Sequence, residues 1–175
     1  MMRGESALEK EDFKEAIDEF NKVLQQDPSN EAAKERLAIS HKKMKAHREN
    51  VVRGLVQMNN AGFVMYQRQE FVKAGQSWRD VIHRYESQND PELQRELPFK
   101  IHEVKGTLHQ LIRNMLDKGV LLYRQGELRA AVSAWQDVLL IEPKQPEAEE
   151  YIEKARVKIE TLETLSRPAT PLRLR

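Results

Sequence analysis

Residues 119–143 read GVLLYRQGELRAAVSAWQDVLLIEP, and this stretch predicts two helices joined by a tight turn. The first helix should end just before Gly126, because glycine readily supplies the left-handed residue that follows many helices. The second should run from about Glu127 to Ile141, since Pro143 cannot continue a helix. Small residues and large apolar ones recur at helical spacing. The stretch therefore predicts a helical hairpin.

Two further copies of this hairpin occur upstream. Residues 62–86 match residues 119–143 at a constant offset of 57 (135 − 78 = 57). Residues 13–28 match the second helix and its closing proline at an offset of 115 (143 − 28 = 115), nearly twice the first offset. Ungapped matches at almost even spacing predict an internal repeat. The expected repeat core consists of Phe20, Gly62, Ala74, Trp78, Gly119, Ala131 and Trp135.

The order of small and large residues resembles the tetratricopeptide repeat (TPR) family. The residues that carry the resemblance are Gly119, Tyr123, Gly126, Ala131, Trp135, Val138 and Pro143. The resemblance implies an all-α fold in which helical hairpins stack into an α-solenoid. The family unit is about 34 residues long, so the copies here lie roughly 23 residues further apart. We interpret the extra length as elongation of the first helix of each unit, which gives a TPR-like solenoid with long connecting helices.

The repeat predicts the organisation of the chain. We expect a truncated first unit over residues 1–30, a second unit with an elongated first helix over 31–91, and a third unit over 92–146. A capping helix should cover 147–166, and the tail 167–175 should be disordered. Gly4 aligns with Gly119, so most of the first helix of the first unit is expected to be missing, either because upstream repeats are absent or because the protein starts on a half unit. Residues 31–67 should form one long helix, or two helices with a break near Glu49 and Asn50.

Composition limits the classes of function. Charged residues make up 33% of the chain and aromatic residues 6%, a mixture that suits helices with one solvated face. The 29 Lys and Arg nearly balance the 28 Asp and Glu, so the net charge of +1 predicts neither nucleic-acid binding nor membrane attraction. The absence of cysteine excludes disulfides and thiolate chemistry and leaves the compartment open.

The sequence predicts a protein that does not insert directly into a membrane. No apolar run reaches the roughly 18–20 residues of a spanning helix, and the start MMRGESALEK lacks the apolar centre of a secretion signal. A cytoplasmic location is favoured if the chain is complete, and a periplasmic one is open if it is a fragment.

The sequence indicates no enzyme, no metal site and no cofactor. His102 and Glu103 begin like a zinc-protease motif, but Gly106 stands where its second histidine is needed. His102 and His109 lie two helical turns apart, too far for one tetrahedral zinc ion without a third element. The seven glycines are scattered and form no phosphate-binding loop. The basic stretch 41–50 is interpreted as a solvated helix face, because no aromatic residue for base stacking is interleaved.

The expected function is a non-catalytic scaffold that binds a partner protein, as a peptide or a helix. In the family that the chain resembles, the first helix of each unit lines the concave face. The positions that this implies are Asn59, Asn60, Phe63, Tyr66 and Gln67 in the second unit, and Arg113, Leu116, Asp117, Val120, Tyr123 and Arg124 in the third. Tyr66 and Tyr123 are equally well explained as structural residues. Asp117 disfavours a clamp for a partner's C-terminal carboxylate, because its charge would repel that group. The alternative is a structural subunit that assembles end to end with copies of itself.

Overall fold

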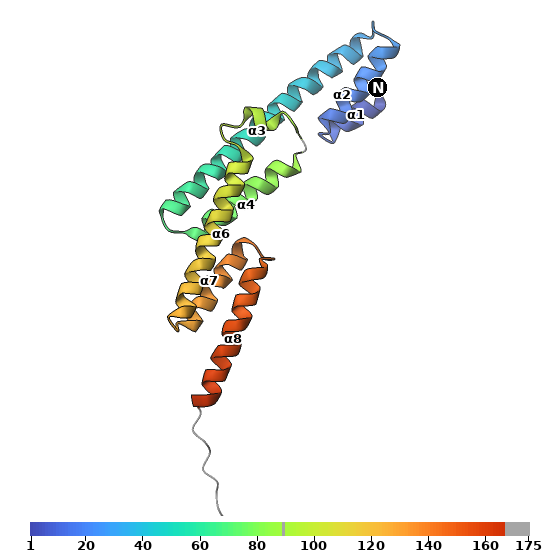
Figure 1. The fold of residues 1–175 in the computed structure, drawn as a ribbon. Helices are drawn as coiled ribbons and strands as arrows, with labels where there is room; N and C mark the ends of the chain where they lie inside the picture. Colours follow the sequence, from blue (N-terminus) through green and yellow to red (C-terminus); the bar gives the residue numbers. More distant parts are fainter. Residues whose placement is uncertain (89, 167–175) are drawn as a thin grey trace, which may run out of the picture. The chain divides into compact units, whose positions relative to one another are not determined.

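A computed structural model of the protein describes residues 1–88 and 90–166, and the expected disordered tail lies outside them. The described residues form eight helices and no strand, as the expectation of an all-α fold requires (Figure 1). The helices are α1 (Met2–Glu9), α2 (Phe13–Gln26), α3 (Glu31–Gln67), α4 (Phe71–Ser87), α5 (Leu93–Glu96), α6 (Ile101–Arg124), α7 (Leu128–Ile141) and α8 (Pro146–Ser166). They divide into two compact units, Met1–Val56 with Pro91–Leu97, and Gln57–Asp90 with Pro98–Arg175.

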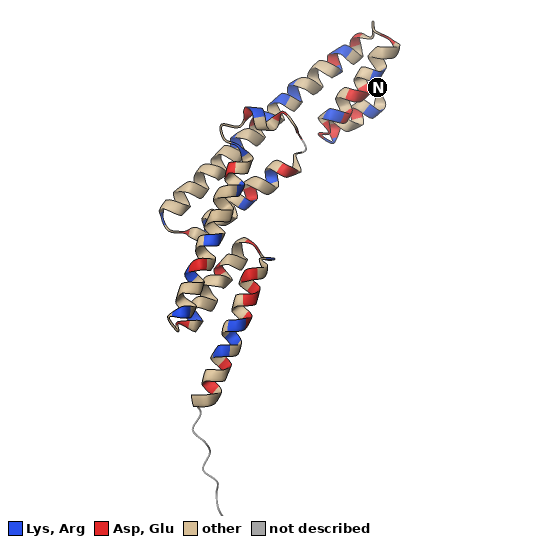
Figure 2. Cartoon of the chain, viewed as in Figure 1, with Lys and Arg blue, Asp and Glu red and all other residues tan. Residues whose placement is uncertain are grey.

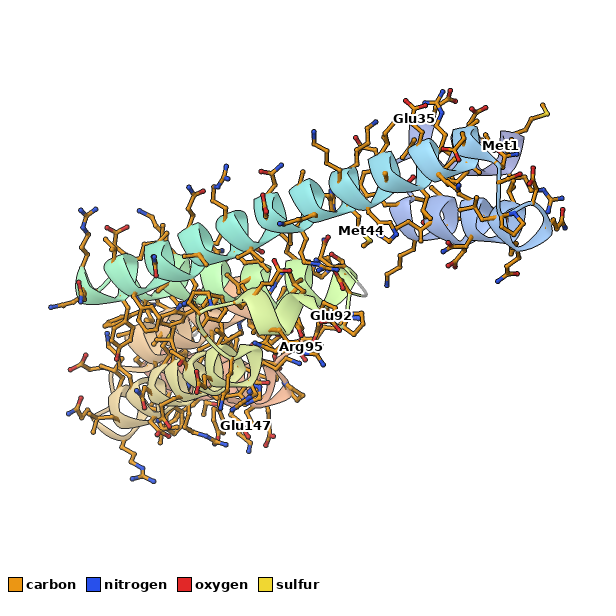
Figure 3. The ribbon with its side chains drawn as sticks, turned by 90° about the horizontal axis from the view of Figure 1, so that it is seen from above. Met1, Glu35, Met44, Glu92, Arg95 and Glu147 are labelled. Atoms are coloured by element: carbon orange, nitrogen blue, oxygen red, sulfur yellow. The ribbon has the colours of Figure 1, made fainter. Side chains whose placement is uncertain are left out.

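The core of the first unit lies between α1, α2 and the beginning of α3. Its buried residues are Ala7, Leu8, Phe13, Ala16 and Phe20, and Leu37, Ile39 and Met44 of α3 pack against them. Met44 points from α3 toward α2 (Figure 3). Side chains cap both later helices, since Asp12 accepts from the N–H of Glu15 over 3.0 Å and Asn30 accepts from the N–H of Ala33 over 2.9 Å.

Helix α3 is one continuous helix of 37 residues, so the alternative of a break near Glu49 and Asn50 is wrong. Its middle is covered by the segment around α5. Leu93 and Leu97 are buried in the same unit as Val51 and Leu55, and Glu96 pairs with Arg48 over 3.0 Å. The short α5 therefore shelters a stretch of α3 that would otherwise leave apolar residues in water.

The second unit is built from the end of α3 and from α4, α6, α7 and α8. Helix α6 packs on α7, α7 packs on α8, and α4 contacts both α6 and α7. Two side chains of α4 bond to the carboxyl end of α7: Gln76 donates to the carbonyl of Leu140 over 3.1 Å, and Arg79 donates to that of Ile141 over 2.5 Å. These bonds satisfy carbonyl groups that have no partner inside α7.

The three expected hairpins share one turn geometry. The residue in the left-handed region is Glu11 (φ +60°), Gln69 (φ +62°) and Gly126 (φ +84°) in turn. The next residue donates its N–H across each turn, with N–O distances of 2.9 Å from Asp12 to Ala7, 3.0 Å from Glu70 to Met65 and 2.9 Å from Glu127 to Leu122. The expected left-handed glycine at position 126 is confirmed, and the two other turns reach the same conformation without glycine.

Each hairpin also places a glycine of its first helix against a large ring of its second helix. The pairs are Gly4 with Phe20, Gly62 with Trp78 and Gly119 with Trp135, each 16 residues apart (20 − 4, 78 − 62 and 135 − 119). A Cβ atom added to Gly62 would lie 2.5 Å from Trp78 Nε1, and one added to Gly4 would lie 2.7 Å from the Phe20 ring. The absence of a side chain thus lets the two helix backbones approach each other.

The helix that follows each hairpin has the same pattern of buried and half-buried positions, with steps of four, three and four residues. The positions are Ala33, Leu37, Ser40 and Met44 in α3, Val104, Leu108, Leu111 and Met115 in α6, and Ala148, Ile152, Ala155 and Ile159 in α8. Because α8 packs on α7 and α6 packs on α4, these helices cover the hairpins that precede them. We call them the covering helices.

Candidate functional site

The structure separates the residues proposed for a partner surface by their exposure. Asn60, Phe63, Tyr66 and Gln67 are exposed on α3, and Arg113, Asp117 and Arg124 are exposed on α6. Val120 and Tyr123 are half-buried. Asn59 and Leu116 are buried, with 6% and 2% of their surface exposed.

Asn59 and Leu116 face the interior of their hairpins, so neither belongs to an accessible surface of the described chain. Each precedes the close-approach glycine of its helix by three residues, which places both on the side that meets the tryptophan. In the third hairpin Trp135 donates its indole N–H to the carbonyl of Leu116 over 3.1 Å.

A charge-free stretch of α3 carries the exposed residues of the second hairpin. Residues 54–67 read GLVQMNNAGFVMYQ and contain no Asp, Glu, Lys or Arg, although one third of the whole chain is charged. Figure 2 shows this part of α3 as an unbroken uncharged length between Arg53 and Arg68. We define the open face as its exposed residues Asn60, Phe63, Val64, Tyr66 and Gln67. The run of uncharged residues is visible in the sequence and would have identified this helix as distinct.

Two aromatic rings of the open face rest on a buried tryptophan. Phe63 and Tyr66 keep 46% and 41% of their surface exposed. The ring of Phe63 meets Trp78 edge to face at a centroid distance of 5.2 Å, and Tyr66 lies 5.9 Å from Trp78 and 5.4 Å from Phe71. Such packing fixes the orientation of both rings before any partner arrives.

Two polar atoms beneath the open face have no hydrogen-bond partner in the described chain. They are Asn59 Oδ1 and Trp78 Nε1, and both are buried. The equivalent indole, that of Trp135, is bonded to a backbone carbonyl. Because a buried polar atom without a partner costs stability, the second hairpin is packed less favourably at this point than the third.

The corresponding surface on the third hairpin is contacted by α8. Lys158 Nζ lies 4.7 Å from the centroid of the Tyr123 ring, and Tyr151 packs on Trp135 at 5.2 Å. Glu147 pairs with Arg113 over 3.3 Å. Three of the positions proposed for partner binding or hairpin core are thus engaged by the chain itself, whereas the open face on α3 remains accessible.

A cleft of about 430 Å³ adjoins the open face. It is lined by the turn and the beginning of α4, and by residues of α6 and α7: Gln69, Glu70, Phe71, Val72, Lys73, Met115, Lys118, Ala134 and Asp137. Phe71 links it to the ring of Tyr66. Lys73 donates to Glu70 over 2.5 Å, and this hydrogen bond lowers the pKa of the Glu70 carboxyl group. The acidic and basic residues of the cleft balance, so it presents no strong field to a ligand.

Within residues 1–88 and 90–166, no three His, Cys, Asp or Glu side chains are grouped so that they could hold a metal ion. Among the same residues, no helix is both long enough and apolar enough to cross a membrane.

The sequence matches no protein-family model, and comparison with curated proteins and with solved structures gives no match either.

Proposed function

We propose that the protein is a non-catalytic scaffold of TPR-like helical hairpins that binds a partner protein through the open face of α3. The observation that carries this proposal is the pair of exposed rings, Phe63 and Tyr66, on a helix segment without charge. The shared turn, the glycine–aromatic pairs and the covering helices support the TPR-like description.

The chemistry of the open face is that of an interface core. The centres of protein interfaces are depleted in charged residues and enriched in aromatic residues and methionine. Residues 54–67 have this composition, including Met58 and Met65, and the surrounding chain does not. Rings that are held in place by Trp78 and Phe71 lose little conformational entropy when a partner covers them.

A site-specific photo-crosslinker at position 63 tests this proposal. We expect it to give a discrete covalent adduct with one protein in cells of the source organism. A crosslinker at His83 serves as the control, because His83 is exposed on α4 and lies outside the open face. Adducts that are equal at the two positions, or absent at position 63, would contradict the proposal.

A second candidate function is self-association through α8, and a specific observation favours it. Val157, Leu162 and Leu165 keep 55%, 51% and 77% of their surface exposed on this helix. Apolar side chains in such positions suit a helix that packs against another copy. Light scattering across a concentration series tests it: mass should rise with concentration in the parent and remain that of a monomer in Leu162→Glu.

A further inference from the structure

The ring pair that the second hairpin presents is repeated in the third. Tyr66 and Tyr123 are equivalent positions (123 − 66 = 57). Tyr66 lies 5.9 Å from Trp78 with an interplanar angle of 40°, and Tyr123 lies 6.1 Å from Trp135 with an angle of 42°. The two hairpins therefore offer the same tyrosine in the same setting.

In the third hairpin, the tyrosine holds a cation. The ammonium group of Lys158 lies over the ring of Tyr123, at 4.7 Å from its centroid. A ring face attracts a cation through its quadrupole, and the attraction increases when the site is shielded from water. The covering helix α8 supplies this lysine together with the ring of Tyr151, which packs on Trp135.

In the second hairpin, the covering helix supplies neither group. The buried positions of α6 and α8 align Val104 with Ala148, so Thr107 corresponds to Tyr151 and Asn114 corresponds to Lys158 (107 − 104 = 151 − 148, and 114 − 104 = 158 − 148).

Both side chains are hydrogen-bonded within α6. Thr107 donates to the carbonyl of Glu103, and Asn114 accepts from Gln110. In the part of the chain that the structure describes, the ring of Tyr66 has no cation over it.

We infer that the partner supplies the missing cation: a protein segment that places a Lys or Arg over the ring of Tyr66 and an apolar residue against Phe63. This inference rests on the proposed function and specifies the chemistry of its partner. An amphipathic basic segment is favoured over an acidic one because a carboxylate is repelled by the negative face of an aromatic ring. The open face itself has no charge, so the selectivity lies in the ring contact and not in a long-range field.

Selection of displayed random peptides on the full chain provides the probe. We expect peptides whose binding is lost in Tyr66→Ala to carry a Lys or Arg next to an apolar residue. In a synthetic peptide with the selected sequence, replacement of that Lys by norleucine, or of that Arg by a neutral citrulline, should weaken binding about 2- to 30-fold. Tyr66→Phe should bind as the parent does, because the phenyl ring keeps the π-face.

A substitution on α6 tests the same contact from inside the protein. Asn114→Lys places a cation where α8 carries Lys158, so we expect it to compete for Tyr66 and weaken peptide binding several-fold. Asn114→Gln adds a comparable length without charge and should leave binding unchanged. Asn114 is exposed, and both variants should melt as the parent does.

The outcomes distinguish this inference from the proposed function. If the peptides depend on Tyr66 and Phe63 but bind equally well with norleucine or citrulline, the cation is wrong and the docking face stands. If selection yields only peptides that ignore Tyr66→Ala and Phe63→Ala, or yields none, the inference is overturned. The crosslinking experiment then decides independently whether the open face binds a protein.

Discussion

Gly119 lies directly beneath the indole of Trp135, so that a Cβ atom at position 119 would overlap Trp135 Nε1. The contact holds the two helices of the third hairpin at close range. We predict that Gly119→Ala destabilises the protein by about 1–3 kcal/mol or more, because neither the helix backbone nor the buried indole can move away. Urea unfolding followed by circular dichroism measures the change.

Gly106 provides the matched control on the same helix. A Cβ atom added there meets nothing within 4 Å. Gly106→Ala should therefore stabilise the protein by up to about 1 kcal/mol, through the better helix propensity of alanine. Equal effects of the two substitutions would refute the close packing of Gly119.

The two buried tryptophans should respond differently to removal of the indole N–H. Trp135 donates this group to the carbonyl of Leu116, whereas Trp78 Nε1 has no partner. Both Trp→Phe variants lose packing volume, but only Trp135→Phe also loses a hydrogen bond. We predict that Trp135→Phe is more destabilising than Trp78→Phe by about 1 kcal/mol. Thermal denaturation of the two variants gives the comparison, and a larger loss for Trp78→Phe would contradict it.

The turn of the second hairpin stores backbone strain that glycine would relieve. Gln69 has φ +62°, a conformation that costs a residue with a side chain about 1–2 kcal/mol. Gln69→Gly should stabilise the protein by up to that amount, less the entropy that glycine gains when the chain unfolds. Gln57→Gly, at an exposed position inside α3, should instead destabilise it by about 1 kcal/mol. A parallel loss of stability in both variants would show that the turn is unstrained.

Asp27 links the turn after α2 to pH. Its carboxylate accepts from Ser29 Oγ over 2.7 Å and from the Ser29 N–H over 3.1 Å, and the Ser29 side-chain bond is the main cause of its lowered pKa. The stabilising contribution is present above the unfolded-state pKa and is lost as pH falls through the folded-state pKa. An NMR titration should show the pKa of Asp27 rising in Ser29→Ala. No change in that pKa would exclude the hydrogen bond as its cause.

The hairpins could be predicted from the sequence because their signals are local. Gly126 and Pro143 mark helix ends by their own backbone restrictions, and the spacing of Trp78 and Trp135 repeats without gaps. The left-handed residues Glu11 and Gln69 carry no comparable signal, since their conformation is imposed by the packing around them.

Even spacing of the hairpins concealed two different causes. Phe20 and Trp78 are 58 residues apart (78 − 20), mainly because α3 is 37 residues long. Trp78 and Trp135 are 57 residues apart, yet α6 has only 24 residues, and the linker that contains α5 supplies most of the rest. Elongation of the first helix is therefore correct for the second unit and only part of the explanation for the third.

The candidate surface could be predicted in part. The family resemblance led to α3 and α6 but could not tell Asn59 from Asn60, because one helical step separates a buried side chain from an exposed one. It also could not reveal that α8 covers Tyr123 with Lys158, a contact between residues 35 positions apart (158 − 123). The absence of charge over residues 54–67 was the stronger sequence signal for an accessible face.

The affinity of the partner captured at position 63 tests the account most directly. It should be measured for the parent, for Phe63→Asp and for Lys42→Asp, all of which carry changes at exposed sites. Our account predicts that Phe63→Asp weakens binding at least about 30-fold, as loss of an aromatic hot spot of 2 kcal/mol or more would, at an unchanged melting temperature, and that Lys42→Asp has little effect. Unchanged affinity of Phe63→Asp together with a large loss in Lys42→Asp would place the binding site on the basic stretch of α3 and contradict the account.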